Sequence, residues 1–197
     1  MTLVPIPAWN AQGVIPPINA LNPISVERSP YTVSLIDFVD QFSTSPERRT
    51  VLQGFLRYRA ALHVAGLING FQWLNGSFLE NVETLEGRAP RDLDVVTFYR
   101  LPAGQSQQDV QLLAPHLFPI NRTAQEQLKA TFHVDAYLVH LGMIPERLVE
   151  RSAYWYGLWS HRRNQLWKGY VQINLAPTED AAAGAAIAGL GNPGAQP

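Results

Sequence analysis

Four short runs of apolar residues constrain the fold of this chain more than any other feature of its sequence. They cover residues 71–74, 93–99, 132–139 and 170–175 and are rich in the β-branched and aromatic residues that are typical of strands. In the last run, Val171, Ile173 and Leu175 alternate with polar residues, so one face of that strand is apolar. Helical segments separate the runs. The pattern predicts an α/β protein (α+β) with a mixed twisted sheet flanked by helices.

The helices are predicted from their N-terminal signals. They begin at Ser34, at Pro46 after a Ser45 N-cap, at the capping boxes Ser106…Asp109 and Thr123…Glu126, and at Pro145. The second helix is expected to end near Gly66, because glycine is common just after a helix.

Composition divides the chain into three parts. Residues 1–31 are rich in proline and predict an irregular arm packed on the core, since proline lacks a backbone donor. Residues 32–176 form the predicted domain. Residues 177–197 are rich in alanine, glycine and proline, and we expect them to be disordered.

The overall composition excludes several classes of function. Cysteine is absent, which excludes a disulfide scaffold, a thiol nucleophile and a thiolate zinc site. The formal net charge of −1 gives no global electrostatic case for binding nucleic acid. No run approaches the roughly 20 apolar residues of a membrane span, and the first residues do not have the pattern of a signal peptide. We therefore expect a cytoplasmic protein that does not associate with membranes.

Two acids stand at the start of the second apolar run. The side chains of Asp92 and Asp94 project from the same face of a strand, because side chains alternate with a period of two. Two neighbouring carboxylates repel each other, and a hard divalent cation relieves that repulsion. The alternative is a solvated strand end whose acids pair with Arg88 and Arg91.

Two further features add to this pair. Gly76-Ser77 follows the first short strand, and a glycine there lets the backbone approach a ligand while a hydroxyl and turn N–H groups hold a phosphate. Asp135 interrupts an apolar strand, where an acid requires a partner or an ion, and His133 and Tyr137 are expected on its face. An ordinary turn and a half-exposed strand remain the alternatives.

Together, Gly76-Ser77, Asp92-Leu93-Asp94 and the hydrophobic–Asp–hydrophobic pattern at Asp135 resemble the signature of the DNA polymerase beta-like nucleotidyltransferase superfamily. The wider sequence resembles a bacterial family of small nucleotidyltransferase-like proteins of unknown function, through residues 35–54 and 155–169. The resemblance covers roughly residues 10–175. The intervening residues 78–91 are expected to form a flexible loop.

The resemblance implies a set of roles. Gly76 and Ser77 would grip a nucleoside triphosphate. Asp92 and Asp94 would hold two Mg²⁺ (or Mn²⁺) ions, and Asp135 would complete one metal site and help to activate the attacking hydroxyl. Nucleotidyl transfer needs in-line positioning and charge neutralisation, which such a two-metal site provides.

The most basic segment covers residues 160–169. Arg162, Arg163 and Lys168 are candidates for phosphate contacts, and Trp159 or Trp167 for stacking on a base. The alternative is a solvated turn whose tryptophans close the core.

Three functions follow from the sequence. The first is a Mg²⁺-dependent nucleotidyltransferase that uses an NTP and a hydroxyl acceptor on RNA, protein or a small molecule, in a setting such as a toxin–antitoxin or phage-defence system. The second is an inactive nucleotide-binding or protein-interaction module with the same fold. The third is a structural partner protein that uses its proline arm and aromatic surface, and a homodimer remains open.

Overall fold

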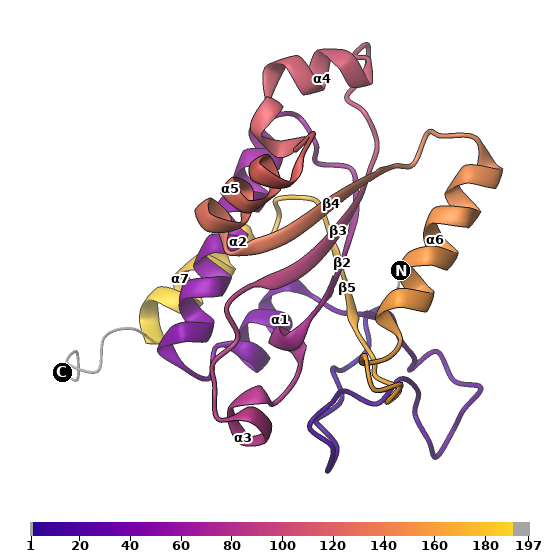
Figure 1. Ribbon diagram of the computed structural model, residues 1–197, viewed down its shortest axis with the longest axis vertical. Helices are drawn as coiled ribbons and strands as arrows, with labels where there is room; N and C mark the ends of the chain where they lie inside the picture. The colour runs from indigo at the N-terminus through magenta and orange to yellow at the C-terminus, as the bar shows by residue number, and fades with distance from the viewer. Residues whose placement is uncertain (1, 191–197) are drawn as a thin grey trace.

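A mixed five-stranded sheet forms the centre of the computed structural model, which describes residues 2–190 (Figure 1). Its strands are β1 (Tyr31–Thr32), β2 (Gly70–Asn75), β3 (Leu93–Tyr99), β4 (Val134–His140) and β5 (Val171–Asn174). Their order in the sheet is β1-β5-β2-β3-β4. Strand β2 is antiparallel to both of its neighbours, whereas β1 is parallel to β5 and β3 is parallel to β4. The predicted mixed α/β architecture is confirmed.

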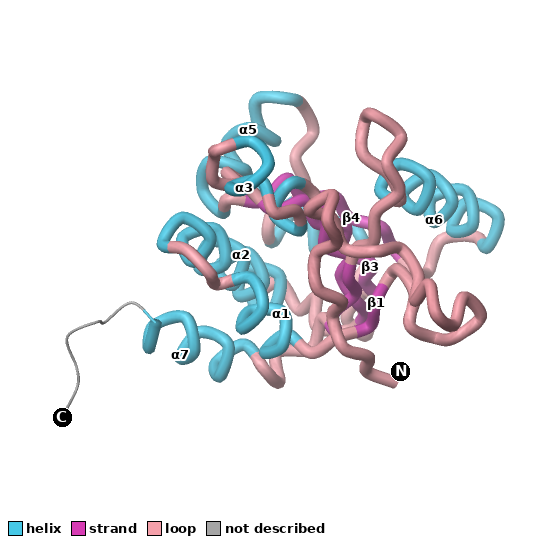
Figure 2. The backbone as a smooth tube through the Cα atoms, turned by 90° about the horizontal axis from the view of Figure 1, so that it is seen from below, coloured by secondary structure: helices cyan, strands magenta, loops and turns pink. Residues whose placement is uncertain are grey.

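Helices cover both faces of this sheet. They are α1 (Leu35–Phe42), α2 (Pro46–Val64), α3 (Val82–Glu86), α4 (Gln107–Leu113), α5 (Arg122–Phe132), α6 (Pro145–Trp159) and α7 (Asp180–Leu190), with 3₁₀ turns at Ser77–Leu79 and Pro115–Leu117. In the two perpendicular views, α1, α2, α5 and α7 lie on one side of the sheet and α6 lies on the other (Figures 1 and 2). No helix of the described residues is long and apolar enough to cross a membrane.

The starts of the helices follow the predicted capping chemistry with one exception. The Ser34 and Ser45 hydroxyls accept the N–H groups of Asp37 and Arg48, and the capping box of α4 is present. The predicted box at Thr123…Glu126 is wrong. The side chain of Asn121 caps α5 instead, because it accepts the Ala124 N–H at 2.9 Å.

The proline-rich N-terminal segment packs against the domain without a helix or a longer strand before β1. Its Val4 N–H donates to the Thr32 carbonyl at 2.8 Å, and the Trp9 indole N–H donates to the Leu79 carbonyl at 2.8 Å. Val14 and Ile15 are buried. These contacts attach the segment to β1 and to the 3₁₀ turn that follows β2.

The C-terminal segment differs from its prediction. Residues 180–190, which were expected to be disordered, form α7, while residues 191–197 of that predicted tail lie outside the described residues. Alanine is the best helix former, and Ala183 and Ile187 are buried beside α1 and α2. The buried Arg59 of α2 holds the start of α7 through two hydrogen bonds to Asp180, the shorter at 2.7 Å.

Two local expectations near the strands are also wrong. Residues 78–91 are not all loop, because α3 forms there, and its Glu83 pairs with the buried Arg48 at 2.6 Å. His133 is not in a strand, since α5 extends to Phe132 and His133 ends it with a φ of 54°. Strand β4 therefore begins at Val134, and Tyr137 alone shares the face of Asp135 as predicted.

Candidate functional site

The acids predicted from the sequence meet at one end of the sheet. Asp94, near the start of β3, pairs in register with Asp135 of β4 on one side and with Asn75 of β2 on the other. Directly paired residues project to the same face, which here is the face covered by α6, because Tyr137 of β4 contacts Trp155 of α6 at 4.7 Å between ring centroids. Asp92 precedes β3 by one residue.

Two of these three acids have protein partners from α5. The Lys129 ammonium lies 2.5 Å from Asp92 Oδ2 and 3.8 Å from Asp135 Oδ2. The Gln125 side chain donates to Asp135 Oδ1 at 2.7 Å. The pairing with Arg88 and Arg91 considered from the sequence is wrong for the described residues, where Arg88 pairs with Glu86 and the acids pair with Lys129.

Asp94 differs from both neighbouring acids. Its carboxylate makes no hydrogen bond or ion pair with any residue from 2 to 190. Burial, together with the charges of Asp135 and Asp92, raises the pKa of Asp94 to about 6, against the opposing effect of Lys168 and Lys129. A half-buried carboxylate with a raised pKa and no partner is typical of a functional site.

The donor chemistry fits a hard divalent cation, but the arrangement of the side chains is not that of a formed metal site. Carboxylate oxygens are the ligands that Mg²⁺ prefers, and Asp94 has no hydrogen-bond or ion-pair partner in the described part of the chain. Within the described part of the chain, however, no three His, Asp or Glu side chains are grouped to hold a metal ion. Asp92 and Asp135 face Lys129 instead.

Gly76 has a geometry that only glycine tolerates. Its φ of 86° and ψ of −171° lie in a region closed to other residues. A Cβ at this position would lie 2.8 Å from Asp94 Oδ2, so the absence of a side chain lets the turn lie against the acid. Ser77 follows it at the start of a 3₁₀ turn.

A pocket of about 720 Å³ opens beside this turn. Its lining includes eight residues singled out from the sequence, Gly76, Ser77, Arg88, Asp94, Trp159, Arg162, Arg163 and Lys168. Asp92 and Asp135 are not among its lining residues. The structure thus brings the glycine turn, one acid and the basic segment to one cavity, with the other two acids next to it.

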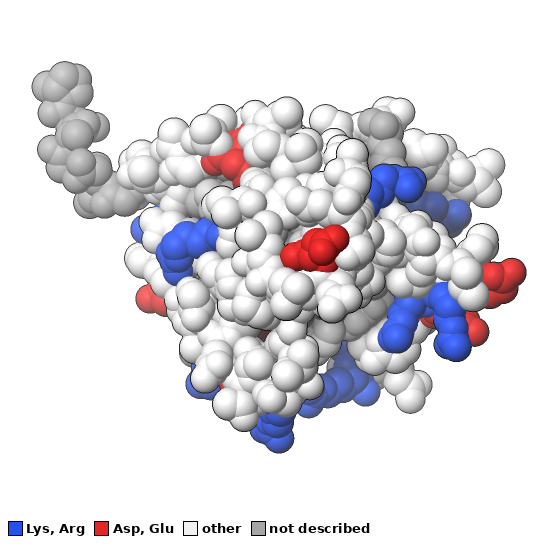
Figure 3. Space-filling model, turned by 90° about the horizontal axis from the view of Figure 1, so that it is seen from above, with Lys and Arg blue, Asp and Glu red and all other residues white. Residues whose placement is uncertain are grey.

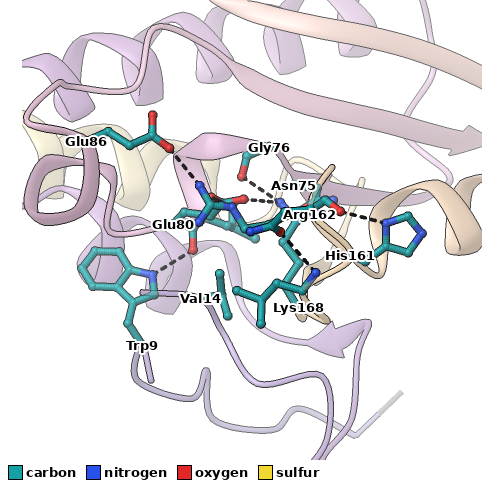
Figure 4. Close-up of polar contacts among 12 residues, drawn as sticks. Trp9, Val14, Asn75, Gly76, Glu80, Glu86, His161, Arg162 and Lys168 are labelled. Carbon is teal, nitrogen blue, oxygen red and sulfur yellow. Dashed lines mark hydrogen bonds and ion pairs between the residues drawn. The ribbon is translucent and has the colours of Figure 1, made fainter. Parts of the chain in front are cut away.

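The cations of this pocket are not equally available (Figure 4). Lys168 is buried and lies 2.6 Å from Glu80 Oε1, and Arg162 lies 3.0 Å from Glu80 Oε2 and 2.8 Å from Glu86. Arg163 is exposed and makes no ion pair among the residues that the structure describes. Two of the three predicted phosphate ligands are therefore neutralised by glutamates.

The tryptophans considered for base stacking lie in different environments. Trp159 is buried and packs on Trp155 and Tyr170, so it belongs to the core. Trp167 is 61% exposed in the loop before β5, where it forms an isolated bridge with His161.

The His140 ring at the end of β4 stacks on the Tyr99 ring, with 5.4 Å between the ring centroids, and His140 does not line the pocket.

The sequence did not predict the residues that hold the walls of this pocket in place through contacts with segments far away along the chain. Arg48 of α2 is fully buried and donates to the carbonyls of Phe78 and Glu80, which fixes the segment after Gly76-Ser77. Glu80 and Lys129 were missed as well. The one sequence signal for Lys129 is its position four residues after Gln125, which places both side chains on one face of α5.

The face of the molecule that includes α4 differs from the pocket. Seen from above, it carries Lys and Arg side chains in separate spots with uncharged surface between them (Figure 3). At the sheet end beside Gly76, acidic and basic side chains line one common pocket.

The fold and the site define a mixed α/β protein with a pocket lined by acidic and basic residues at one end of its sheet. A family model described as "Family of unknown function (DUF6932)" matches residues 7–174, and the chain belongs to that family. No curated protein and no solved structure matches the chain.

Proposed function

We propose that this protein is a Mg²⁺-dependent nucleotidyltransferase that transfers a nucleotidyl group from an NTP to a hydroxyl on RNA, protein or a small molecule. The observation that carries the proposal is the Asp94 carboxylate. It has no partner among the described residues, pairs in register with Asp135, and lies against Gly76 in a pocket lined by basic residues.

The proposed reaction assigns a role to each side of the pocket. The acceptor oxygen attacks the α-phosphorus, the bond from that phosphorus to the oxygen bridging to the β-phosphate breaks, and pyrophosphate leaves. The hydroxyl proton passes to Asp135, the acid beside the pocket. The triphosphate lies against the Gly76-Ser77 turn, where the missing side chain permits close approach, and meets the charge of Arg163.

The three aspartates are the residues that would hold a divalent cation. Asp94, Asp135 and Asp92 would hold it, and it would neutralise charge on the triphosphate and on the transition state. The chain's own residues position the triphosphate and contribute positive charge, and positioning with electrostatic stabilisation is most of what phosphoryl-transfer sites require.

The test is ligand-dependent thermal stability, followed by transfer of labelled nucleotide. The melting temperature of the wild type should rise with an NTP only when Mg²⁺ or Mn²⁺ is present. Asp94→Asn should abolish that rise, and Asp40→Asn, which changes an exposed acid on α1, should preserve it. A wild type whose stability is unaffected by every NTP would refute the proposal.

One observation favours a second candidate, a nucleotide-binding module without turnover. Lys129 already neutralises Asp92, and Glu80 neutralises Lys168 and Arg162, so much of the charge is balanced within the protein. Under this alternative the NTP raises the melting temperature but no labelled nucleotide is transferred. Both functions are compatible with the cytoplasm, where NTP and Mg²⁺ are available. A toxin–antitoxin or phage-defence setting belongs to the nucleotidyltransferase proposal alone.

A further inference from the structure

Lys129 occupies an unusual position for a surface lysine. Its ammonium lies within 4 Å of carboxylate oxygens from two different segments, Asp92 before β3 and Asp135 on β4. Gln125, one helical turn earlier on α5, donates to the same Asp135. One face of α5 therefore approaches the acidic end of the sheet with a positive charge and an amide donor.

The charge at this end of the sheet makes a cation necessary. Three carboxylates lie close together there, and Lys129 is the one cation that forms an ion pair with any of them among residues 2–190. The Lys129 ammonium compensates part of the repulsion between the acids, because it lies within 4 Å of oxygens from two of them.

The ion pair is also easy to open. The Lys129 side chain is 41% exposed, and ion pairs of exposed side chains are weak because water and salt screen them. Lys168 provides the contrast, since its side chain is 7% exposed and it is enclosed with Glu80. Lys129 can move into solvent at little cost, whereas Lys168 cannot.

We propose that Lys129 is a tethered counter-ion that competes with a divalent cation for Asp92 and Asp135. In the resting protein the ammonium holds these two acids. A divalent cation that binds with the nucleotide displaces the ammonium and gathers the acids around Asp94. The inference rests on the proposed function, because it concerns the same site, and it adds that the chain itself opposes metal binding in the absence of nucleotide.

The experiment measures binding of Mn²⁺ alone and of Mn²⁺ with ATP, by calorimetry and by the shift in melting temperature. In Lys129→Met, Mn²⁺ alone should bind about fivefold more tightly than in the wild type, which is the size of a modest ion-pair coupling. Without metal, Lys129→Met should melt at a lower temperature, since three acids are left uncompensated, and Mn²⁺ should restore more stability to it than to the wild type.

Two further variants serve as controls. Lys129→Arg keeps the charge and should keep the weak binding of the wild type. Arg122→Met removes another cation from α5 that pairs with the exposed Glu126 and not with the acids, so its Mn²⁺ affinity should not change.

The outcomes separate this inference from the proposed function. Metal-dependent ATP binding in the wild type, with equal or weaker Mn²⁺ affinity in Lys129→Met, would overturn the role of Lys129 and leave the function standing. If neither the wild type nor Lys129→Met binds Mn²⁺ with or without ATP, the nucleotidyltransferase proposal fails, and the competition fails with it.

Discussion

Two acids, Glu80 and Asp94, line the same pocket but differ in whether a cation pairs with them. Glu80 is 5% exposed and is held by Lys168 and Arg162 through ion pairs of 2.6 and 3.0 Å. Asp94 is half-buried and has no partner among the described residues, and its pKa is raised to about 6. The first acid has the surroundings of a structural group and the second those of a ligand site.

The difference indicates which residues carry function. A buried acid with two cations stabilises the protein only while the group is complete, because removing one member leaves uncompensated charge. An acid left without a partner lowers the stability of the native state, and such a cost is typical of sites that a ligand completes. Substitutions at the two regions should therefore change stability in opposite directions.

The largest effect is expected at the paired acid. Glu80→Gln leaves the buried Lys168 without its carboxylate and should lower the free energy of unfolding by about 3 kcal/mol. Glu86→Gln is the control, because Glu86 is exposed and also pairs with Arg162, and it should cost less than about 1 kcal/mol. Urea unfolding measures both, and equal losses would show that Glu80 is not a structural group.

The next effect concerns the turn that contacts the unpaired acid. Gly76→Ala places a side chain on a backbone with φ of 86° and brings a Cβ to 2.8 Å from Asp94, so it should cost about 2 kcal/mol. Gly87→Ala also introduces a side chain at positive φ, but no atom lies within 4 Å of the new Cβ, and it should cost about 1 kcal/mol. In an Asp94→Ala background the loss at Gly76 should become smaller but stay above that at Gly87, because the backbone conformation of Gly76 is closed to other residues. A loss at Gly76 that is unchanged there would mean that the contact with Asp94 contributes nothing to it.

At the unpaired acid, Asp94→Asn should stabilise the protein by about 1 to 2 kcal/mol at pH 7 in the absence of metal. The pKa of Asp94 is raised in the native state from 3.8 to about 6, so the native state binds this proton more tightly than the unfolded state does. Wild-type stability should therefore fall as the pH rises through this window, and asparagine removes that loss.

The pH profile checks the sign of this effect. Urea unfolding between pH 3.5 and 7 should show the two proteins nearly equal below about pH 4 and diverging up to about pH 6. A variant less stable than the wild type at pH 7 would mean that Asp94 has a stabilising partner.

Sequence patterns were sufficient where the determining contacts are local. A period of two placed the Asp94 side chain on one face of a strand, and the apolar runs located four of the strands. Ser45 and Ser106 were read as caps because the hydroxyl of an N-cap and the backbone N–H that donates to it lie three residues apart. The Gly76 turn was found for the same reason.

The residues that complete the site were not predicted because their partners are distant in the sequence. Glu80 pairs with Lys168, 88 residues away, and Arg48 binds Glu83, 35 residues away. Helix α7 was misread because its alanines and glycines resemble a linker, whereas Ala183 and Ile187 pack against distant helices and Asp180 pairs with Arg59. Composition and local sequence patterns do not reveal such ion pairs, because the paired residues come together only when the chain folds.

The smallest effect on stability, and the sharpest test of the comparison, is expected for the cations. Arg163 is exposed and unpaired among residues 2–190, so Arg163→Gln should change the free energy of unfolding by less than about 0.5 kcal/mol. If it meets the triphosphate, its loss should weaken NTP binding about fivefold, measured by calorimetry with Mg²⁺ present. Arg162→Gln, in contrast to Arg163→Gln, should lower the free energy of unfolding, because it removes a partner of Glu80. Loss of NTP binding in Arg162→Gln alone would reverse the assignment, since the paired arginine would then be the one that leaves Glu80 to bind the ligand.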